Sequence, residues 1–152
     1  MKRISTFFIV AALATIGLTS CNKETYVCYI AEGRVIDKTT GEPVQNIMVS
    51  FHVYDIIHSK DEQEKRKPSS IDYEGYDGSS NENGEFNTLI RISEEYHPSL
   101  LYIYGNENGL YKDTVISVDF SKVPLSGTPN KKDKYKGDYV LNIGDVALEK
   151  IE

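Results

Sequence analysis

The sequence predicts an all-β domain, and three observations support this prediction. Apolar and polar residues alternate with a period of two through much of residues 29–149, as in strands with one buried face. The apolar positions are rich in β-branched and aromatic residues, which favour pleated sheets. Clusters of Gly, Asn, Asp and Pro interrupt the alternation, as turns between strands do. No strong helical period competes with this pattern after the N-terminal segment.

The first half of the domain contains two predicted strands and one long loop. The first strand covers residues 29–37, and turn formers fill residues 38–43. The second strand covers residues 47–54. Its predicted inner face comprises Ile47, Val49, Phe51 and Val53. Residues 58–75 carry mixed charge without apolar periodicity, so we expect an exposed loop, either a solvated connection or a recognition element.

The second half adds the remaining strands. A strand is predicted over residues 85–92, with Phe86, Thr88, Ile90 and Ile92 facing inward. Further strands are predicted over residues 100–104, 111–118 and 138–149, with a polar loop over residues 121–136. About seven short strands at this spacing favour an immunoglobulin-like β-sandwich over a barrel. The chain has no tryptophan, so the Cys…Trp…Cys core of a true immunoglobulin domain is missing.

The N-terminus has the layout of an export signal. Lys2 and Arg3 precede an apolar run over residues 7–18, and Leu18-Thr19-Ser20-Cys21 follows. This pattern resembles the bacterial lipobox. The resemblance implies removal of residues 1–20 as a signal peptide, lipidation of Cys21 and acylation of the new N-terminus. The run of about twelve apolar residues is short for a membrane-spanning helix, which takes about twenty. An ordinary secretory cleavage that leaves Cys21 as a thiol is the other alternative.

These expectations divide the chain into three parts and predict its location in the cell. Residues 1–20 form the signal helix, residues 21–28 the lipidated cysteine and a tether, and residues 29–150 the domain. The membrane is then a partner through the lipid on Cys21. Asn22 after the lipidated residue favours outer-membrane sorting, by analogy with known sorting rules. We therefore expect a lipoprotein of the cell envelope of a Gram-negative bacterium, at the outer membrane.

The net charge and the cysteine content limit the kinds of partner that we expect. The full chain has 17 basic and 23 acidic residues and a net charge of −6. Cleavage removes Lys2 and Arg3 but no acid, which leaves a net charge of −8. An acidic domain without a basic face makes nucleic acid an unsuitable partner. With Cys21 lipidated, Cys28 has no partner within the chain, and we expect it to be buried as a small hydrophobe or, alternatively, to form an intermolecular disulfide.

Several segments resemble a known β-sandwich family. The first carries Gly33, Val35 and Asp37, with the turn Thr40-Gly41-Glu42-Pro43 after it. The second is Asn81-Glu82-Asn83-Gly84-Glu85-Phe86, and the last is Gly144-Asp145-Val146-Ala147-Leu148. Together they resemble the carboxypeptidase-regulatory-like, or transthyretin-like, domain, and the whole chain is similar to the radical SAM-associated lipoprotein family. That resemblance implies a neighbouring radical SAM enzyme and no defined activity for the lipoprotein itself.

The sequence offers no catalytic constellation. Asn81–Gly84 recurs as Asn106–Gly109. Two hairpin turns or a calcium loop would explain the repeat, but the spacing of a complete calcium site is missing. We therefore predict no metal site and no cofactor. The three histidines, His52, His58 and His97, are far apart, and His52 falls on the outer face of its predicted strand, where we expect it to be solvated. Nucleophile-elbow and phosphate-loop motifs are missing. We expect the protein not to be an enzyme.

Tyrosines supply the best candidate for a binding surface. The chain has eleven, and Tyr102 and Tyr104 alternate with Leu101 and Ile103, which predicts an outward-facing pair. Half-buried sheet positions would equally account for many of the tyrosines. We expect a membrane-anchored, non-catalytic sandwich that binds an envelope protein partner, as an accessory of a radical SAM enzyme system. The alternatives are a substrate of that enzyme, modified at Cys28 or a loop tyrosine, and a glycan-binding module. The sequence does not identify a small-molecule ligand.

Overall fold

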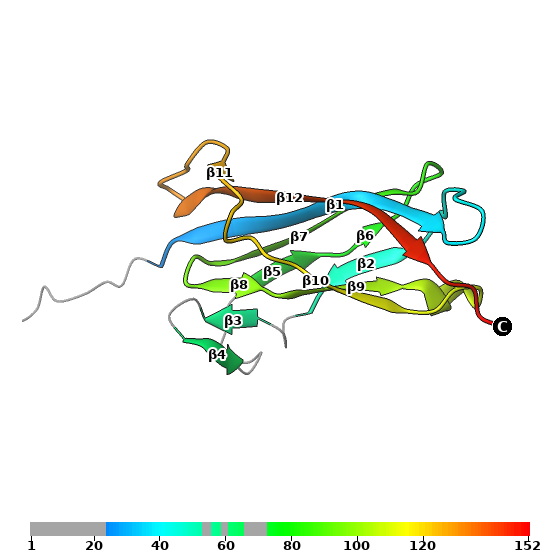
Figure 1. Ribbon diagram of the computed structural model, residues 1–152. Coiled ribbons are helices and arrows are strands. Elements are labelled where there is room, and N and C mark those ends of the chain that lie inside the picture. Colours follow the sequence, from blue (N-terminus) through cyan, green and yellow to red (C-terminus); the bar gives the residue numbers. More distant parts are fainter. Residues whose placement is uncertain (1–23, 53–55, 59–60, 66–72) are drawn as a thin grey trace, which may run out of the picture.

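The computed structural model describes residues 24–52, 56–58, 61–65 and 73–152 (Figure 1). The predicted signal helix, the predicted lipidation site Cys21 and the predicted inner residue Val53 lie outside these residues. Strands make up nearly all of the regular secondary structure of the described residues, which also include a 3-10 turn at Gly105–Asn108. This confirms the all-β prediction.

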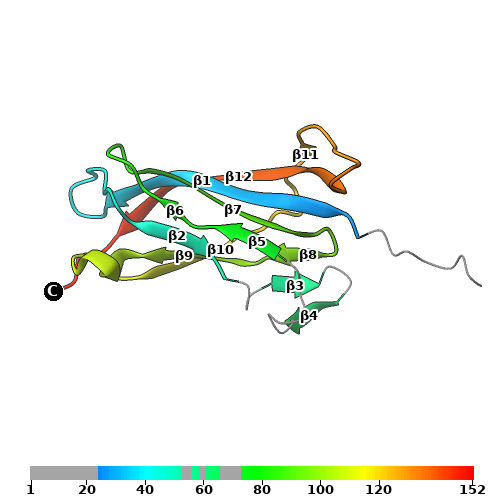
Figure 2. The same ribbon diagram turned by 180° about the vertical axis from the view of Figure 1, so that it is seen from behind.

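Two main sheets face each other, and a smaller sheet lies at one end (Figures 1 and 2). The first contains, in spatial order, β11 (Leu125–Ser126), β12 (Tyr135–Leu148), β1 (Tyr26–Asp37), β7 (Glu85–Ser93) and β5 (Tyr73–Tyr76). The second contains β10 (Thr114–Ser117), β9 (Leu100–Tyr104), β2 (Met48–Phe51) and β6 (Gly78–Ser79). The small sheet contains β4 (Asp61–Lys65), β3 (Ile56–His58) and β8 (Tyr96–Pro98). The two main sheets make the predicted β-sandwich.

The core lies between the two main sheets and follows the predicted alternation. Ile47, Val49 and Phe51 are buried on one side. The predicted inner face of β7 is buried on the other, with Phe86, Thr88, Ile90 and Ile92 all at most 4% exposed. Period-two alternation therefore identified the buried faces of these two strands correctly.

The prediction of an exposed loop over residues 58–75 is wrong in part. β3 ends at His58, β4 covers Asp61–Lys65, and β5 covers Tyr73–Tyr76. All four residues of β5 are exposed, and β5 lies at the edge of its sheet. A strand without a buried face shows no hydrophobic alternation, so β5 could not be recognised from its residues. Short strands of this kind raise the number from about seven to twelve within the described residues.

The first strand starts earlier than predicted. β1 begins at Tyr26, and Val27 is fully buried, so the period-two pattern extends back from Tyr29. β1 lies between β7, which is antiparallel to it, and β12, which is parallel to it. The parallel register runs from the Tyr26–Tyr135 pair to the Asp37–Leu148 pair. The first and last strands of the domain are therefore neighbours.

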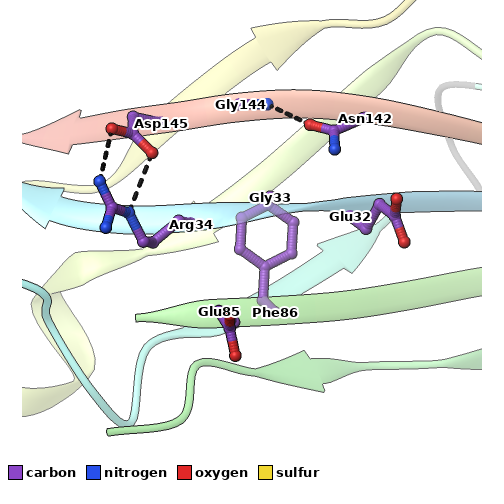
Figure 3. Close-up of a pocket in the computed structure, with 8 residues that line it drawn as sticks. All are labelled: Glu32, Gly33, Arg34, Glu85, Phe86, Asn142, Gly144 and Asp145. Atoms are coloured by element: carbon purple, nitrogen blue, oxygen red, sulfur yellow. Dashed lines mark hydrogen bonds and ion pairs between the residues drawn. The ribbon is translucent and has the colours of Figure 1, made fainter. Parts of the chain in front are cut away.

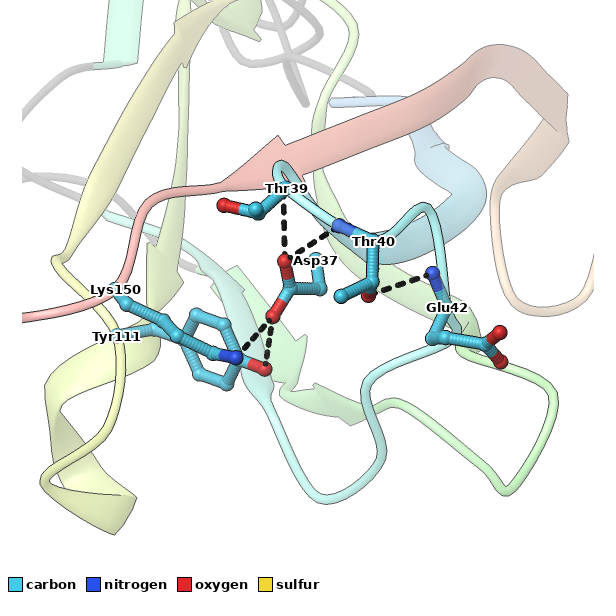
Figure 4. Close-up of polar contacts among 6 residues, drawn as sticks. All are labelled: Asp37, Thr39, Thr40, Glu42, Tyr111 and Lys150. Atoms are coloured by element: carbon cyan, nitrogen blue, oxygen red, sulfur yellow. Dashed lines mark hydrogen bonds and ion pairs between the residues drawn. The ribbon is translucent and has the colours of Figure 1, made fainter.

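Asp37 organises the turn that the sequence singled out (Figure 4). One carboxylate oxygen accepts hydrogen bonds from the backbone N–H groups of Thr39 and Thr40, at 2.7 and 3.0 Å. The other accepts the Tyr111 hydroxyl at 3.0 Å and pairs with the Lys150 ammonium at 2.9 Å. These partners, Lys150 first, hold the pKa of Asp37 far below its usual range. The motif residue is thus a structural anchor, which agrees with its interpretation as part of the turn.

Candidate functional site

Tyr102 and Tyr104 lie on the outer face of the second sheet. Both are half-buried, whereas Leu101 and Ile103 between them are at most 1% exposed and face the core. This alternation confirms the predicted outward orientation of the pair. Their role in binding remains a prediction.

His52 completes a three-ring cluster with the two tyrosines. β2 pairs antiparallel with β9, with Ser50 opposite Tyr102, and this register brings His52 diagonally beside Tyr102. The His52 and Tyr102 rings stack at a centroid distance of 3.8 Å and an interplanar angle of 13°. His52 Nε2 also forms a hydrogen bond with the Tyr104 hydroxyl. We call His52, Tyr102 and Tyr104 the aromatic patch.

Sequence reasoning placed His52 on the outer face but assigned it a solvated role. His52 lies two residues after Ser50, and period-two alternation therefore places both on the outer face of the strand. The strand beside His52 could not be predicted, because the register between β2 and β9 is set by contacts between distant segments. The histidine therefore belongs to the candidate site that the sequence had assigned to the two tyrosines alone.

Polar groups and the apolar side chain of Val115 lie beside the patch. The Ser50 hydroxyl donates a hydrogen bond to Asp77. Burial, reinforced by the nearby Asp77 carboxylate, raises the pKa of Tyr104, so its phenol stays protonated at neutral pH. Val115 lies opposite Tyr102 on the edge strand β10, and 51% of it is exposed. The site thus combines an aromatic and apolar centre with polar neighbours, beside an open sheet edge.

This composition suits binding rather than bond-making. Interfaces are enriched in tyrosine at their centres and polar at their rims, which is the arrangement of the patch.

Within the described ranges, no group of three or more His, Cys, Asp or Glu residues is placed to hold a metal ion. No helix in the part of the chain that the structure describes is long and apolar enough to cross a membrane. No family model, curated protein or solved structure matches this chain.

Among the grooves elsewhere on the sandwich, two are lined by residues of both β1 and β12. One, of about 370 Å³, lies over β1 and β12 where Phe86 covers Gly33 (Figure 3). Its Arg34 guanidinium forms a two-pronged ion pair with Asp145, at 2.8 and 3.0 Å, so these charges satisfy each other. The larger groove, of about 790 Å³, has Tyr29, Phe120 and Tyr139 in its wall. The Tyr29 and Tyr139 rings stack at 5.2 Å, and this wall belongs to the core cluster.

Cys28 differs from the expected buried hydrophobe. Val27 and Tyr29 take the inward positions of β1, so parity places Cys28 on the outer face, where it is half-buried. Partial burial, followed by the charge of Asp138, raises the pKa of the thiol to about 11. A thiol with such a pKa is almost entirely protonated at neutral pH and therefore a poor nucleophile.

The two Asn-Glu-Asn-Gly segments both form turns. The Asn81 side-chain oxygen accepts the backbone N–H groups of Asn83 and Glu85, and Gly84 has a φ of +77°. This turn joins β6 of the second sheet to β7 of the first, so it is a crossing between sheets rather than the expected hairpin within one. The second segment forms the 3-10 turn, which ends at Gly109 with a φ of +72°. Backbone geometry explains the repeat in both places.

Proposed function

We propose that this protein is a lipoprotein, anchored through Cys21 to the outer membrane of a Gram-negative cell, whose non-catalytic sandwich binds an envelope protein through the aromatic patch. The observation that carries the binding role is the cluster of His52, Tyr102 and Tyr104 beside exposed Val115 on an edge strand. Rigid aromatic side chains add contact area at a small entropic cost. The open edge of β10 offers backbone groups to the same partner.

The geometry of the rings favours a protein partner over a glycan. Sugar rings stack on open aromatic faces, but His52 covers one face of Tyr102 at 3.8 Å. The Tyr104 hydroxyl is already engaged with His52. His52 thus occupies one stacking face of Tyr102, and the exposed Val115 side chain opposite Tyr102 suits contact with apolar protein side chains.

The link to a radical SAM enzyme rests on the family resemblance alone. The binding role is compatible with an accessory of that enzyme system. A substrate role would place a modification on Cys28 or on an exposed tyrosine, and comparison of intact masses with and without the enzyme separates the two roles. A mass change would replace the accessory role with the substrate role.

Site-specific crosslinking tests the binding role. A photo-crosslinking residue at position 115 in intact cells should give a discrete higher-mass species. The matched control is position 76, where Tyr76 is 65% exposed on the edge strand β5 of the other sheet. Tyr102→Ala should abolish the species formed from position 115. Equal crosslinking from both positions, or none from position 115, would refute the assignment of the partner to the patch.

A further inference from the structure

A short segment at the start of β12 gathers several lysines in an otherwise acidic chain. Residues 131–136 contain four lysines and a single acid, Asp133, whereas the whole chain has a net charge of −6. Together with Asn130 we call this segment the lysine turn, residues 130–136. Charge of this sign, gathered in one place, calls for an explanation that solubility alone does not supply.

The lysine turn is held firmly against the sandwich. Asn130 and Tyr135 exchange both backbone hydrogen bonds, at 2.9 and 3.0 Å. The Asn130 side chain binds the Asp133 carboxylate at 2.7 Å and accepts the Lys132 N–H at 3.0 Å. The Arg91 guanidinium of β7 donates to the Asp133 carbonyl at 3.0 Å. The lysines are therefore displayed on a defined surface and not on a loose tail.

Three of the four lysines are available for an external partner. Lys136 pairs with Glu94, and Asp133 is engaged with Asn130. The other lysines, Lys131, Lys132 and Lys134, are exposed, and none of them forms an ion pair with the described part of the chain. A local excess of cationic side chains thus remains at this surface.

The lysine turn lies where the chain enters the sandwich. The Tyr26 N–H donates to the Lys134 carbonyl at 2.9 Å, and Tyr26 pairs with Tyr135 at the start of the parallel register. Only residues 22–25 separate Cys21 from β1, and four residues span at most about 14 Å. Figures 1 and 2 show the β11–β12 loop at the end where β1 starts, with the C-terminus at the opposite end.

We propose that the lysine turn contacts anionic lipid headgroups and holds the sandwich upright on the membrane. The inference rests on the proposed lipidation of Cys21, which keeps the turn close to the bilayer surface. Anionic lipid attracts basic residues within about a Debye length, and a cluster of lysines beside a lipid anchor supplies a second attachment. β9 ends at Tyr104, and the segment that follows it bridges the C-terminal residues through Tyr111 and Lys150. In an upright sandwich, the Tyr104 side of the aromatic patch is therefore the side farther from the membrane.

Lysine footprinting tests this orientation. The lipidated protein is placed in nanodiscs of phosphatidylcholine, with or without phosphatidylglycerol, and the acylation rate of each lysine is measured by mass spectrometry. Phosphatidylglycerol should slow acylation of Lys131, Lys132 and Lys134, and salt should reverse the effect. Lys38 and Lys112, which both pair with Glu149 near the C-terminus, should react at the same rate in both discs.

Two matched double variants complete the test. Lys131→Gln with Lys132→Gln should weaken docking on the order of thirtyfold and so expose Lys134 to acylation. Lys38→Gln with Lys112→Gln removes the same charge at the far end and should leave Lys134 protected. Equal rates in both kinds of disc, with the acyl mass present on Cys21, would refute docking while leaving the anchor intact. An intact mass without acyl chains would refute the anchor and the docked orientation together.

Discussion

Replacement of Gly33 by alanine should destabilise the sandwich, because the structure leaves no room for a Cβ atom there. A Cβ at Gly33 would lie 2.7 Å from the Gly144 carbonyl oxygen and 3.0 Å from the Phe86 ring (Figure 3). Ordinary contacts begin at 3.4 Å, so the β12 backbone would have to move by about 0.7 Å. Overpacking of this kind costs about 1–3 kcal/mol.

The net effect is smaller, since alanine also restricts the unfolded chain by about 0.4–1 kcal/mol. We expect a loss of about 1–2 kcal/mol in the free energy of unfolding, which lowers Tm by about 3–10 °C for a domain of this size. Thermal and urea unfolding, followed by circular dichroism, measure both quantities. Gly75→Ala is the control, because its Cβ would meet only ordinary contacts at 3.9 Å or more.

A double variant separates the two clashes. Gly33→Ala with Phe86→Leu relieves the ring contact but not the contact with the Gly144 carbonyl, so the double variant should lose less stability than the sum of the single variants. An unchanged Tm for Gly33→Ala, or a loss equal to that of Gly75→Ala, would refute the steric argument.

Two further predictions concern titratable groups. Because the pKa of Asp37 is lowered on folding, its contribution to stability is complete well above its unfolded pKa of about 3.8 and is lost as the pH falls below that value. Asp37→Asn should therefore lower Tm at pH 7, and the difference from wild type should shrink towards pH 2.5; a constant difference would contradict the proposed charge interactions. In the chain from residue 22 onwards, whose single thiol is Cys28, the rate of alkylation by iodoacetamide should keep rising beyond pH 10, because the pKa is about 11. A plateau near pH 9 would show an unperturbed thiol.

The part of the fold that could be predicted was which face of each strand is buried. Which face of a strand is buried depends on alternation within a few residues, so Phe51, Ile90 and the outward pair of tyrosines were placed correctly. Cys28 shows the limit of that approach. Its apolar neighbours suggested burial, but Val27 and Tyr29 occupy the inward positions and leave the thiol on the outer face.

The features that were missed depend on which segments meet. β5 is exposed on both faces and exists because it pairs with β7, a contact that its own residues do not announce. His52 joins the aromatic patch only through the register of β2 against β9. The position of the lysine turn beside Tyr26 follows from the pairing of the first strand with the last. Local patterns do not encode partners that lie far apart along the chain.

The pairing of β1 with β12 also sets the order of events when the domain is made. Arg34 and Asp145, which bind each other across these strands, are 111 positions apart in the sequence. Bringing such distant residues together lowers the entropy of the chain before any contact compensates for the loss. Folds dominated by such pairings therefore form slowly. β1 cannot take its place between β7 and β12 until β12 (Tyr135–Leu148) has left the ribosome. The sandwich therefore cannot close before β12 is made, and a chain that is still open suits the export proposed above.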